Sequence, residues 1–208
     1  MDDIVQQAMR KWPDVPNCFG WLALDRRGQW RMRDDAAQQA GAPGDPIRHD
    51  GLVQFIARNY QCDADGRWFF QNGPQRVFVE LDYTPWVARF HAGRFTVMTG
   101  DPLQVDTCLL DEQGNLLLAG TLPERLASTA AQSSPHSHIA LLSDTELQAV
   151  EALIAWRDDY DEQDPDASPG DLVMPDGNRL PIARIRADHV AARFGFIANP
   201  QRHAQAGA

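Results

Sequence analysis

Several kinds of residue and motif are scarce in this sequence, and each scarcity excludes a class of protein. Lys11 is the single lysine, so neither a P-loop lysine nor a Schiff-base lysine held in a core is available. Asp and Glu number 29 against 19 Lys and Arg, which gives a formal net charge of −10. Nucleic-acid binding needs clustered basic charge to displace counterions, and we therefore expect no nucleic-acid partner.

Signals for membranes and secretion are also missing. No stretch approaches the roughly 20 apolar residues that a membrane helix needs. The sequence begins MDDIVQQAMRKW, with acids where a secretory signal carries bases and no apolar stretch behind them. Cys18, Cys62 and Cys108 lie far apart and are odd in number, which predicts buried free thiols. Together with an arginine- and alanine-rich composition, these features predict a soluble protein of the bacterial cytoplasm without a membrane partner.

The motifs of common enzymes and cofactor sites do not occur. The sequence contains no GxGxxG, GxxxxGK[ST], GxSxG or HExxH. The acidic segment 158–171 does not fit an EF-hand, because Asp164 stands where glycine is needed and Gly170 where a bidentate glutamate is needed. His136 and His138 stand two residues apart without a third ligand nearby. We therefore expect no cofactor, no metal site and no catalytic residue.

Three Asp-x-x-Gly tetrads separate apolar runs, at residues 25–28, 63–66 and 111–114. An aspartate carboxylate bonds the backbone N–H groups that follow it, and glycine accepts the positive φ that often ends such a turn. The three tetrads therefore predict three β-hairpins. Their uneven spacing argues against a solenoid or a propeller.

Helical patterns are few and do not alternate regularly with the strands. Helices are predicted at residues 3–12, with Trp12 on the apolar stripe, and after caps at Asp50 and at Ser143 or Asp144. A short helix is expected near residues 188–194, and residues 127–138 are predicted to form a loop. These patterns predict an α+β fold of mostly antiparallel hairpins in two β-rich lobes. We place the lobes at residues 1–99 and 100–208, the second with an acidic loop at 158–171.

The densest run of aromatic and β-branched residues is WFFQNGPQRVFVELDYTPW, residues 68–86. A type I′ turn at its Asn-Gly pair would place Trp68 opposite Val77 on an apolar, buried face. The opposite face mixes rings with charge and predicts two alternatives. It is either a half-covered sheet face or a ligand groove, and the groove is formed by four residues: Phe69, Arg76, Phe78 and Tyr83. In the first alternative Arg76 merely covers a ring or pairs with Glu80.

The order of these segments resembles bacterial families catalogued as domains of unknown function. The resemblance rests on DPIRHDGLVQFI, the run from DGRWFF to DYTPW, and TVMTGD, and it covers roughly residues 15–105. A more distant relative, similar in the order of its elements, is described as two packed β-rich repeats with a guessed role in signalling. The resemblance implies the β-rich fold and assigns no catalytic residue.

Three functions remain open at this point. The absence of catalytic motifs and the mixed face favour a non-catalytic module that binds a small anionic ligand or a protein. The alternatives are a hydrolase-like enzyme with a site in the cleft between the lobes, and a structural protein that assembles through an open sheet edge.

Overall fold

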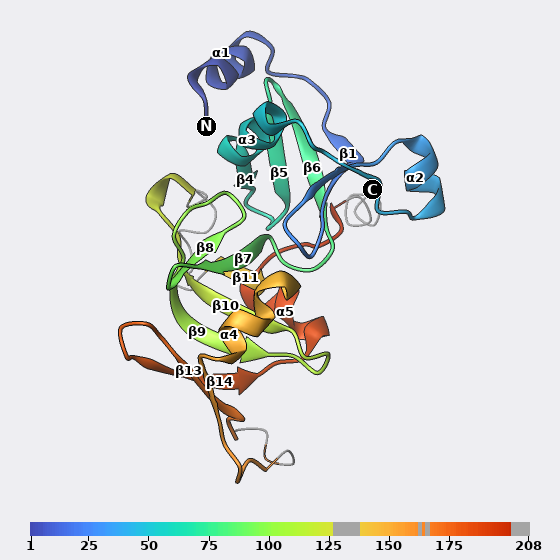
Figure 1. Cartoon of the computed structure of the whole chain (residues 1–208). Coiled ribbons are helices and arrows are strands. Elements are labelled where there is room, and N and C mark those ends of the chain that lie inside the picture. The colour runs from blue at the N-terminus through green and yellow to red at the C-terminus, as the bar shows by residue number, and fades with distance from the viewer. Residues whose placement is uncertain (127–137, 162–163, 165–166, 201–208) are drawn as a thin grey trace. The chain divides into compact units, whose positions relative to one another are not determined.

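The computed structural model describes residues 1–126, 138–161, 164 and 167–200, and these residues divide into two compact units (Figure 1). Unit 1 holds residues 1–85, 124–126 and 195–200. Unit 2 holds residues 86–123 and the described residues from 138 to 194. Each unit contains one mixed sheet. The division at residues 99 and 100 drawn from the sequence stays a prediction.

The sheet of unit 1 has six strands in the order β3-β2-β1-β6-β5-β4. Strands β1 and β6 run parallel, and the other neighbours are antiparallel. The elements of this unit are α1 (Asp3–Lys11), β1 (Cys18–Leu24), β2 (Trp30–Met32), α2 (Asp35–Ala40), β3 (Asp45–Pro46), α3 (Asp50–Arg58), β4 (Tyr60–Cys62), β5 (Trp68–Asn72), β6 (Gln75–Leu81) and the short 3-10 helix η1 (Glu124–Leu126).

One face of this sheet packs against α3, which lies beside β4 and β5 in Figure 1. Ile56 of α3 is buried, and Phe55 meets Phe70 of β5 edge to face at 5.4 Å. Trp68 and Tyr60 continue this core, with ring centroids 4.8 Å apart. The helix begins at His49, whose Nδ1 accepts the Leu52 N–H, so the cap precedes the predicted one at Asp50.

The three Asp-x-x-Gly turns have one common geometry. In each turn one carboxylate oxygen accepts the backbone N–H groups two and four residues later. The glycine of each turn has a φ between 76° and 83°, which glycine adopts without strain. The turns join β1 to β2, β4 to β5, and β9 (Gln104–Leu110) to β10 (Leu116–Thr121). All three predicted hairpins are therefore confirmed.

The hairpin of β5 and β6 differs in register from the prediction. Phe69 pairs with Phe78 and Phe70 with Val77, so the predicted pairing of Trp68 with Val77 is wrong. The loop residues are Gly73, at φ 57°, and Pro74. A type I′ turn needs a positive φ at both central residues, which proline cannot adopt. The slip is two residues, so the predicted division of side chains between the two faces is unchanged.

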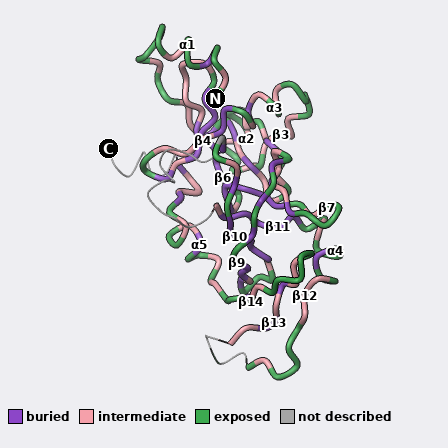
Figure 2. The backbone as a smooth tube through the Cα atoms, turned by 90° about the vertical axis from the view of Figure 1, so that its left-hand side faces the viewer, coloured by how far each residue is buried: buried purple, intermediate pink, exposed green. Residues whose placement is uncertain are grey.

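The sheet of unit 2 has eight strands in the order β12-β13-β14-β9-β10-β11-β7-β8. Figure 2 shows α4 and α5 on opposite sides of β9, β10 and β11, and buried residues concentrated in the strands. The further elements of this unit are β7 (Trp86–His91), β8 (Arg94–Val97), β11 (His138–Leu142), the 3-10 helix η3 (Asp144–Glu146), α4 (Leu147–Glu151), β12 (Ile154–Trp156), β13 (Gly170–Val173), β14 (Arg179–Arg184) and α5 (Ala187–Phe194).

Unit 2 departs from the prediction around its middle helix. The sequence predicts a helix from Ser143 or Asp144 with Leu147 and Ile154 facing inward, but helix α4 covers only residues 147–151 and Leu147 is exposed. Ile154 begins the edge strand β12, which pairs with β13, and Gly170 and Asp171 of the predicted acidic loop belong to β13. Residues 127–137 of the predicted loop lie outside the described residues, and His138 begins β11.

Smaller differences concern α1 and the direction, parallel or antiparallel, in which neighbouring strands pair. Trp12 follows α1 and is half exposed, so it is not part of the apolar stripe on which Val5 is buried. Among the pairings between described strands, β1–β6, β7–β11 and β9–β14 are parallel and the others antiparallel. The α+β class with mostly antiparallel hairpins is therefore confirmed. None of the described helices is long and apolar enough to cross a membrane.

Candidate functional site

Arg76, at the start of β6, lies on the sheet face opposite α3. Its guanidinium carbon stands 4.8 Å from the centroid of the Phe69 ring on β5, and the side chain is half-buried. Because Phe69 is almost fully buried, the ring supports the guanidinium from one side and leaves the fork of N–H groups to contact other molecules. A contact of Arg76 with a ring is expected both if Arg76 merely covers Phe69 and if the face forms a ligand groove, so the observed contact agrees with both alternatives.

The charge of Arg76 is not neutralised within the described part of the chain. No carboxylate among the described residues pairs with it, and in particular Glu80 does not. Two other half-buried arginines differ in this respect, since Arg31 and Arg67 each stand 2.8 Å from an aspartate oxygen. An arginine that is held on a ring and lacks an acidic partner can bind a carboxylate or phosphate through two parallel hydrogen bonds.

Gln71 lies directly opposite Arg76 in the β5–β6 pairing and was not identified from the sequence. Its side chain is 1% exposed, and its amide nitrogen donates to the Gly73 carbonyl at 2.8 Å. Its Oε1 is buried and accepts no hydrogen bond from the described residues. Buried amide oxygens without a partner are uncommon, and no pattern in the sequence distinguishes this glutamine from a surface one.

The other two predicted site residues differ in their relation to Arg76. Phe78 pairs directly with Phe69, with ring centroids 5.8 Å apart, but it is fully buried, with Phe19 stacked on it at 4.6 Å and Arg67 at 5.1 Å from its ring, so it belongs to the packed part of this face. Tyr83 lies apart, because it follows the far end of β6, which is roughly 16 Å from Arg76 at about 3.3 Å per residue. The ligand-binding role of these residues stays a prediction.

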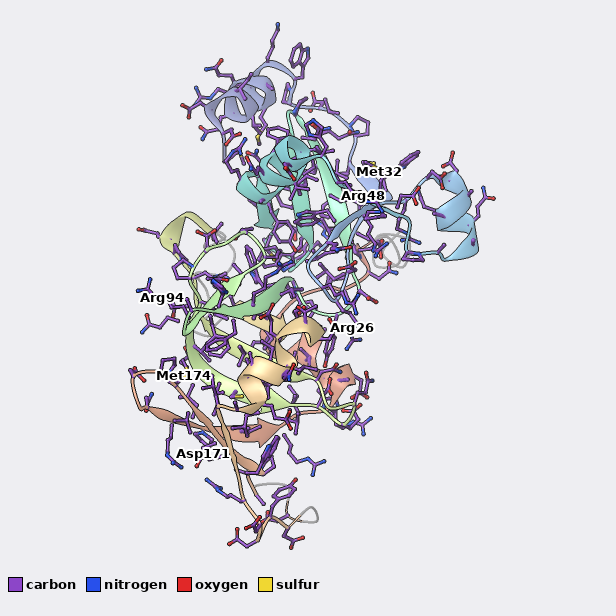
Figure 3. The ribbon with its side chains drawn as sticks, viewed as in Figure 1. Arg26, Met32, Arg48, Arg94, Asp171 and Met174 are labelled. Atoms are coloured by element: carbon purple, nitrogen blue, oxygen red, sulfur yellow. The ribbon has the colours of Figure 1, made fainter. Side chains whose placement is uncertain are left out.

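The Tyr83 ring also contacts an arginine. The guanidinium carbon of Arg26, labelled in Figure 3, lies 4.6 Å from the Tyr83 ring centroid. Arg26 is half-buried in the turn between β1 and β2, and no described carboxylate pairs with it. Among the described residues of unit 1, Arg76 and Arg26 therefore share one kind of environment at different places: each guanidinium lies on a ring and has no described carboxylate partner, whereas Arg67 lies on the Phe78 ring but pairs with Asp63.

The cysteine thiols are free, as expected, and two of them are strongly protected from ionisation. Burial raises the pKa of Cys108 to about 12, and burial together with the charge of Asp63 raises the pKa of Cys62 to about 12. Burial also raises the pKa of the half-buried Cys18. Since the thiolate is the nucleophile, these thiols are poorly suited to covalent catalysis at neutral pH.

The histidines within the described residues do not gather into a metal site. His49 caps α3, while His138 packs against the Trp86 ring at 6.1 Å, where burial lowers its pKa. His136 and His203 lie outside the described residues. Within the described ranges, no three His, Cys, Asp or Glu side chains gather closely enough to hold a metal ion.

Comparison with known proteins identifies a family and no activity. No curated protein matches the chain. A solved structure of a DUF1285 family protein from Silicibacter pomeroyi DSS-3 covers 88% of this chain and 96% of its own, at 13% identity and a TM-score of 0.44. At that TM-score the likeness carries no argument about function. A family model described as "Protein of unknown function (DUF2946)" matches residues 1–201, which confirms the resemblance to a family of unknown function, and this chain belongs to that family.

Proposed function

We propose that this chain is a non-catalytic binding module that holds a small anionic ligand at Arg76 of unit 1. The observation that supports this most is the guanidinium placed 4.8 Å over the buried Phe69 ring, without a carboxylate partner among the described residues. Stacking restricts the guanidinium before a ligand arrives, so less conformational entropy is lost on binding.

The ligand class follows from the chemistry of the arginine. A guanidinium fork matches the two oxygens of a carboxylate or phosphate, and it gains more from a charged acceptor than from a neutral one. The overall charge of −10 repels anions at long range, so affinity must come from short contacts at the site. We also propose that the protein is cytoplasmic, because cysteines that form no disulfide are typical of a reducing compartment.

A thermal-shift screen of carboxylate and phosphate metabolites tests the proposal. We expect a ligand that raises the melting temperature of the native chain, and we expect this rise to disappear in Arg76→Ala. Arg26→Ala is the matched control, because it also removes one charge from a half-buried arginine on a ring. A ligand whose stabilisation survives Arg76→Ala and disappears in Arg26→Ala would move the site to Tyr83 and contradict the assignment to Arg76.

A further inference from the structure

The last described segment of the chain, Gly195–Pro200, returns to unit 1 after an excursion through unit 2. Helix α5 belongs to unit 2 and ends at Phe194, and Gly195 follows it with a φ of 67°. Glycine in this left-handed conformation terminates the helix and lets the chain change direction. The segment is therefore an arm that a single glycine joins to the helix before it.

The arm is bound between the ends of β5 and β6 by its main chain. The Ile197 N–H donates to the Gly66 carbonyl at 2.9 Å, and the Ala198 carbonyl accepts the Leu81 N–H at 2.9 Å. Arg67 and Ile197 form a parallel bridge. Pairing between β5 and β6 begins only at Phe69 and Phe78, so the two strands hold the arm where they no longer pair with each other. Main-chain bonds also hold the peptide in strand addition, but here the strand-like part is confined to Ile197, because Ala198 lies in a bend.

Gly66, Arg67 and Leu81 form the slot that holds the arm. Two further features make this slot specific for the arm. Phe196 is 6% exposed, and Pro200 is also buried, so side chains anchor the arm as well as main-chain bonds. Gly66 approaches the arm so closely that a Cβ atom there would stand 2.4 Å from the Gly195 carbonyl oxygen. A side chain at residue 66 would therefore collide with the arm.

We propose that this slot is a self-recognition site, and that Gly195–Pro200 of one copy of the chain can fill the slot of a second copy. Exchange of an identical element keeps every contact of the bound arm and requires only that the connection at its root open. Gly195 supplies that connection, since glycine adopts extended and left-handed backbone equally well. The partner is a second copy because the arm already fits the slot.

A complementation experiment with two full-length variants tests the exchange. Phe196→Asp damages the arm and leaves the slot intact, whereas Gly66→Ala damages the slot and leaves the arm intact. We expect each variant alone to be monomeric, and a mixture to form a 1:1 heterodimer by light scattering with a melting temperature above that of either variant. A mixture of Phe196→Asp with Gly114→Ala is a control for backbone strain, because Gly114 occupies an equivalent turn at φ 82° with no neighbour near its Cβ position.

The control pair also reports exchange, because Gly114→Ala keeps an intact arm as well as an intact slot. Its own slot is filled by its own arm, so it should form less heterodimer than Gly66→Ala. Two monomers with unchanged melting temperatures in the Gly66→Ala mixture would overturn the proposal. If Gly66→Ala does not fold, a labelled peptide of residues 195–208 replaces it. Saturable binding of that peptide to Phe196→Asp or Ile197→Pro supports the proposal, and no binding to either overturns it.

Discussion

Trp68 is an aromatic core residue of unit 1 whose burial the sequence predicted from alternation along β5 and β6. Trp68 is 5% exposed and packs against Tyr60 at 4.8 Å, although its cross-strand partner is not the predicted one. Its burial depends on which face it occupies, and a two-residue slip preserves the face. The burial of Trp68 could therefore be predicted although its pairing could not, whereas Val77, also predicted to be buried, is half-buried.

Replacement of Trp68 by alanine should lower the free energy of unfolding by about 3–5 kcal/mol, because it removes a large ring from a packed core. Trp12→Ala is the control, since Trp12 is 50% exposed and its loss should cost about 0.5 kcal/mol or less. Chemical denaturation of both variants measures the difference. Equal costs for the two tryptophans would contradict the burial of Trp68.

The buried thiols should make stability fall in alkaline solution. Cys108 has a pKa of about 12 in the folded chain, above its ordinary value of 9.0, so the unfolded chain loses this proton first as the pH rises. Its stabilising contribution is complete below pH 9 and is lost progressively towards pH 12, with a slope of at most ~1.4 kcal/mol per pH unit. Cys62 and Tyr60, whose pKa values burial also raises, change stability in the same direction.

The pH dependence can be assigned to Cys108 with a variant. Cys108→Ala should have a shallower decline in unfolding free energy between pH 9 and pH 11 than the native chain, measured by urea denaturation. The comparison uses slopes, so a general loss of stability from the smaller side chain does not affect it. Parallel slopes for the two proteins would show that Cys108 is not protected from ionisation.

Among the helices and strands, the hairpins could be predicted from local turn chemistry. Strands whose pairing partners are distant in the sequence could not. The Asp-x-x-Gly turns satisfy their own hydrogen bonds within five residues, which is why Asp25, Asp63 and Asp111 could be assigned from sequence. Strands β11 and β12 were missed because they depend on distant partners. Ala140 of β11 pairs with Trp86, and Ile154 of β12 pairs with Leu172.

The contacts of the candidate site could likewise be predicted where they are local in the sequence and not where they join distant segments. The contact of Arg76 with Phe69 could be predicted because both residues belong to one hairpin and one face. The burial of Phe78 under Phe19 could not, because Phe19 lies on β1, which joins β6 by a parallel pairing of distant segments. Nor does any local signal indicate that Gly195–Pro200 returns to β5 and β6, since the main-chain bonds and buried side chains that hold it involve residues distant in the sequence.

Because the arm contacts Gly66 and not Gly114, alanine substitutions at these two equivalent turn glycines should have different effects. Gly66 and Gly114 end matching turns at φ 83° and 82°, so alanine at either position should introduce similar backbone strain, roughly 1–2 kcal/mol. Alanine at residue 66 also collides with the Gly195 carbonyl, whereas nothing lies near a Cβ at residue 114. Gly66→Ala should therefore also release the arm.

Amide hydrogen exchange measures the release directly. In Gly66→Ala the amides of Ile197 and Leu81, which form the two bonds to the arm, should exchange faster than in the native chain. In Gly114→Ala their exchange should be unchanged. Similar exchange at these amides in both variants would show that the arm does not depend on close approach to Gly66.

At the scale of the whole molecule, charge is the main determinant of partners. The formal net charge of −10 should prevent retention on heparin or duplex DNA at physiological salt. The first hairpin carries a basic patch, formed by Arg26, Arg27, Arg31 and Arg33. The patch does not change this expectation, because Asp25 neutralises the Arg31 guanidinium at 2.8 Å and the chain as a whole stays strongly acidic. Salt-dependent retention on heparin that disappears in the double variant Arg26→Ala, Arg27→Ala would contradict it.

If Arg76 is an anion anchor held in place by Phe69, its guanidinium should respond to anions, and NMR of the arginine Nε–H groups measures this response. The Arg76 signal is assigned by its loss in Arg76→Lys, and the chain is titrated with inorganic phosphate and with acetate. We expect the Arg76 signal to shift and saturate with at least one of these anions, while the Arg26 signal, from an arginine on the Tyr83 ring, does not. Equal, unsaturated shifts of both signals, or no shift of the Arg76 signal with either anion, would show that Arg76 does not anchor an anion.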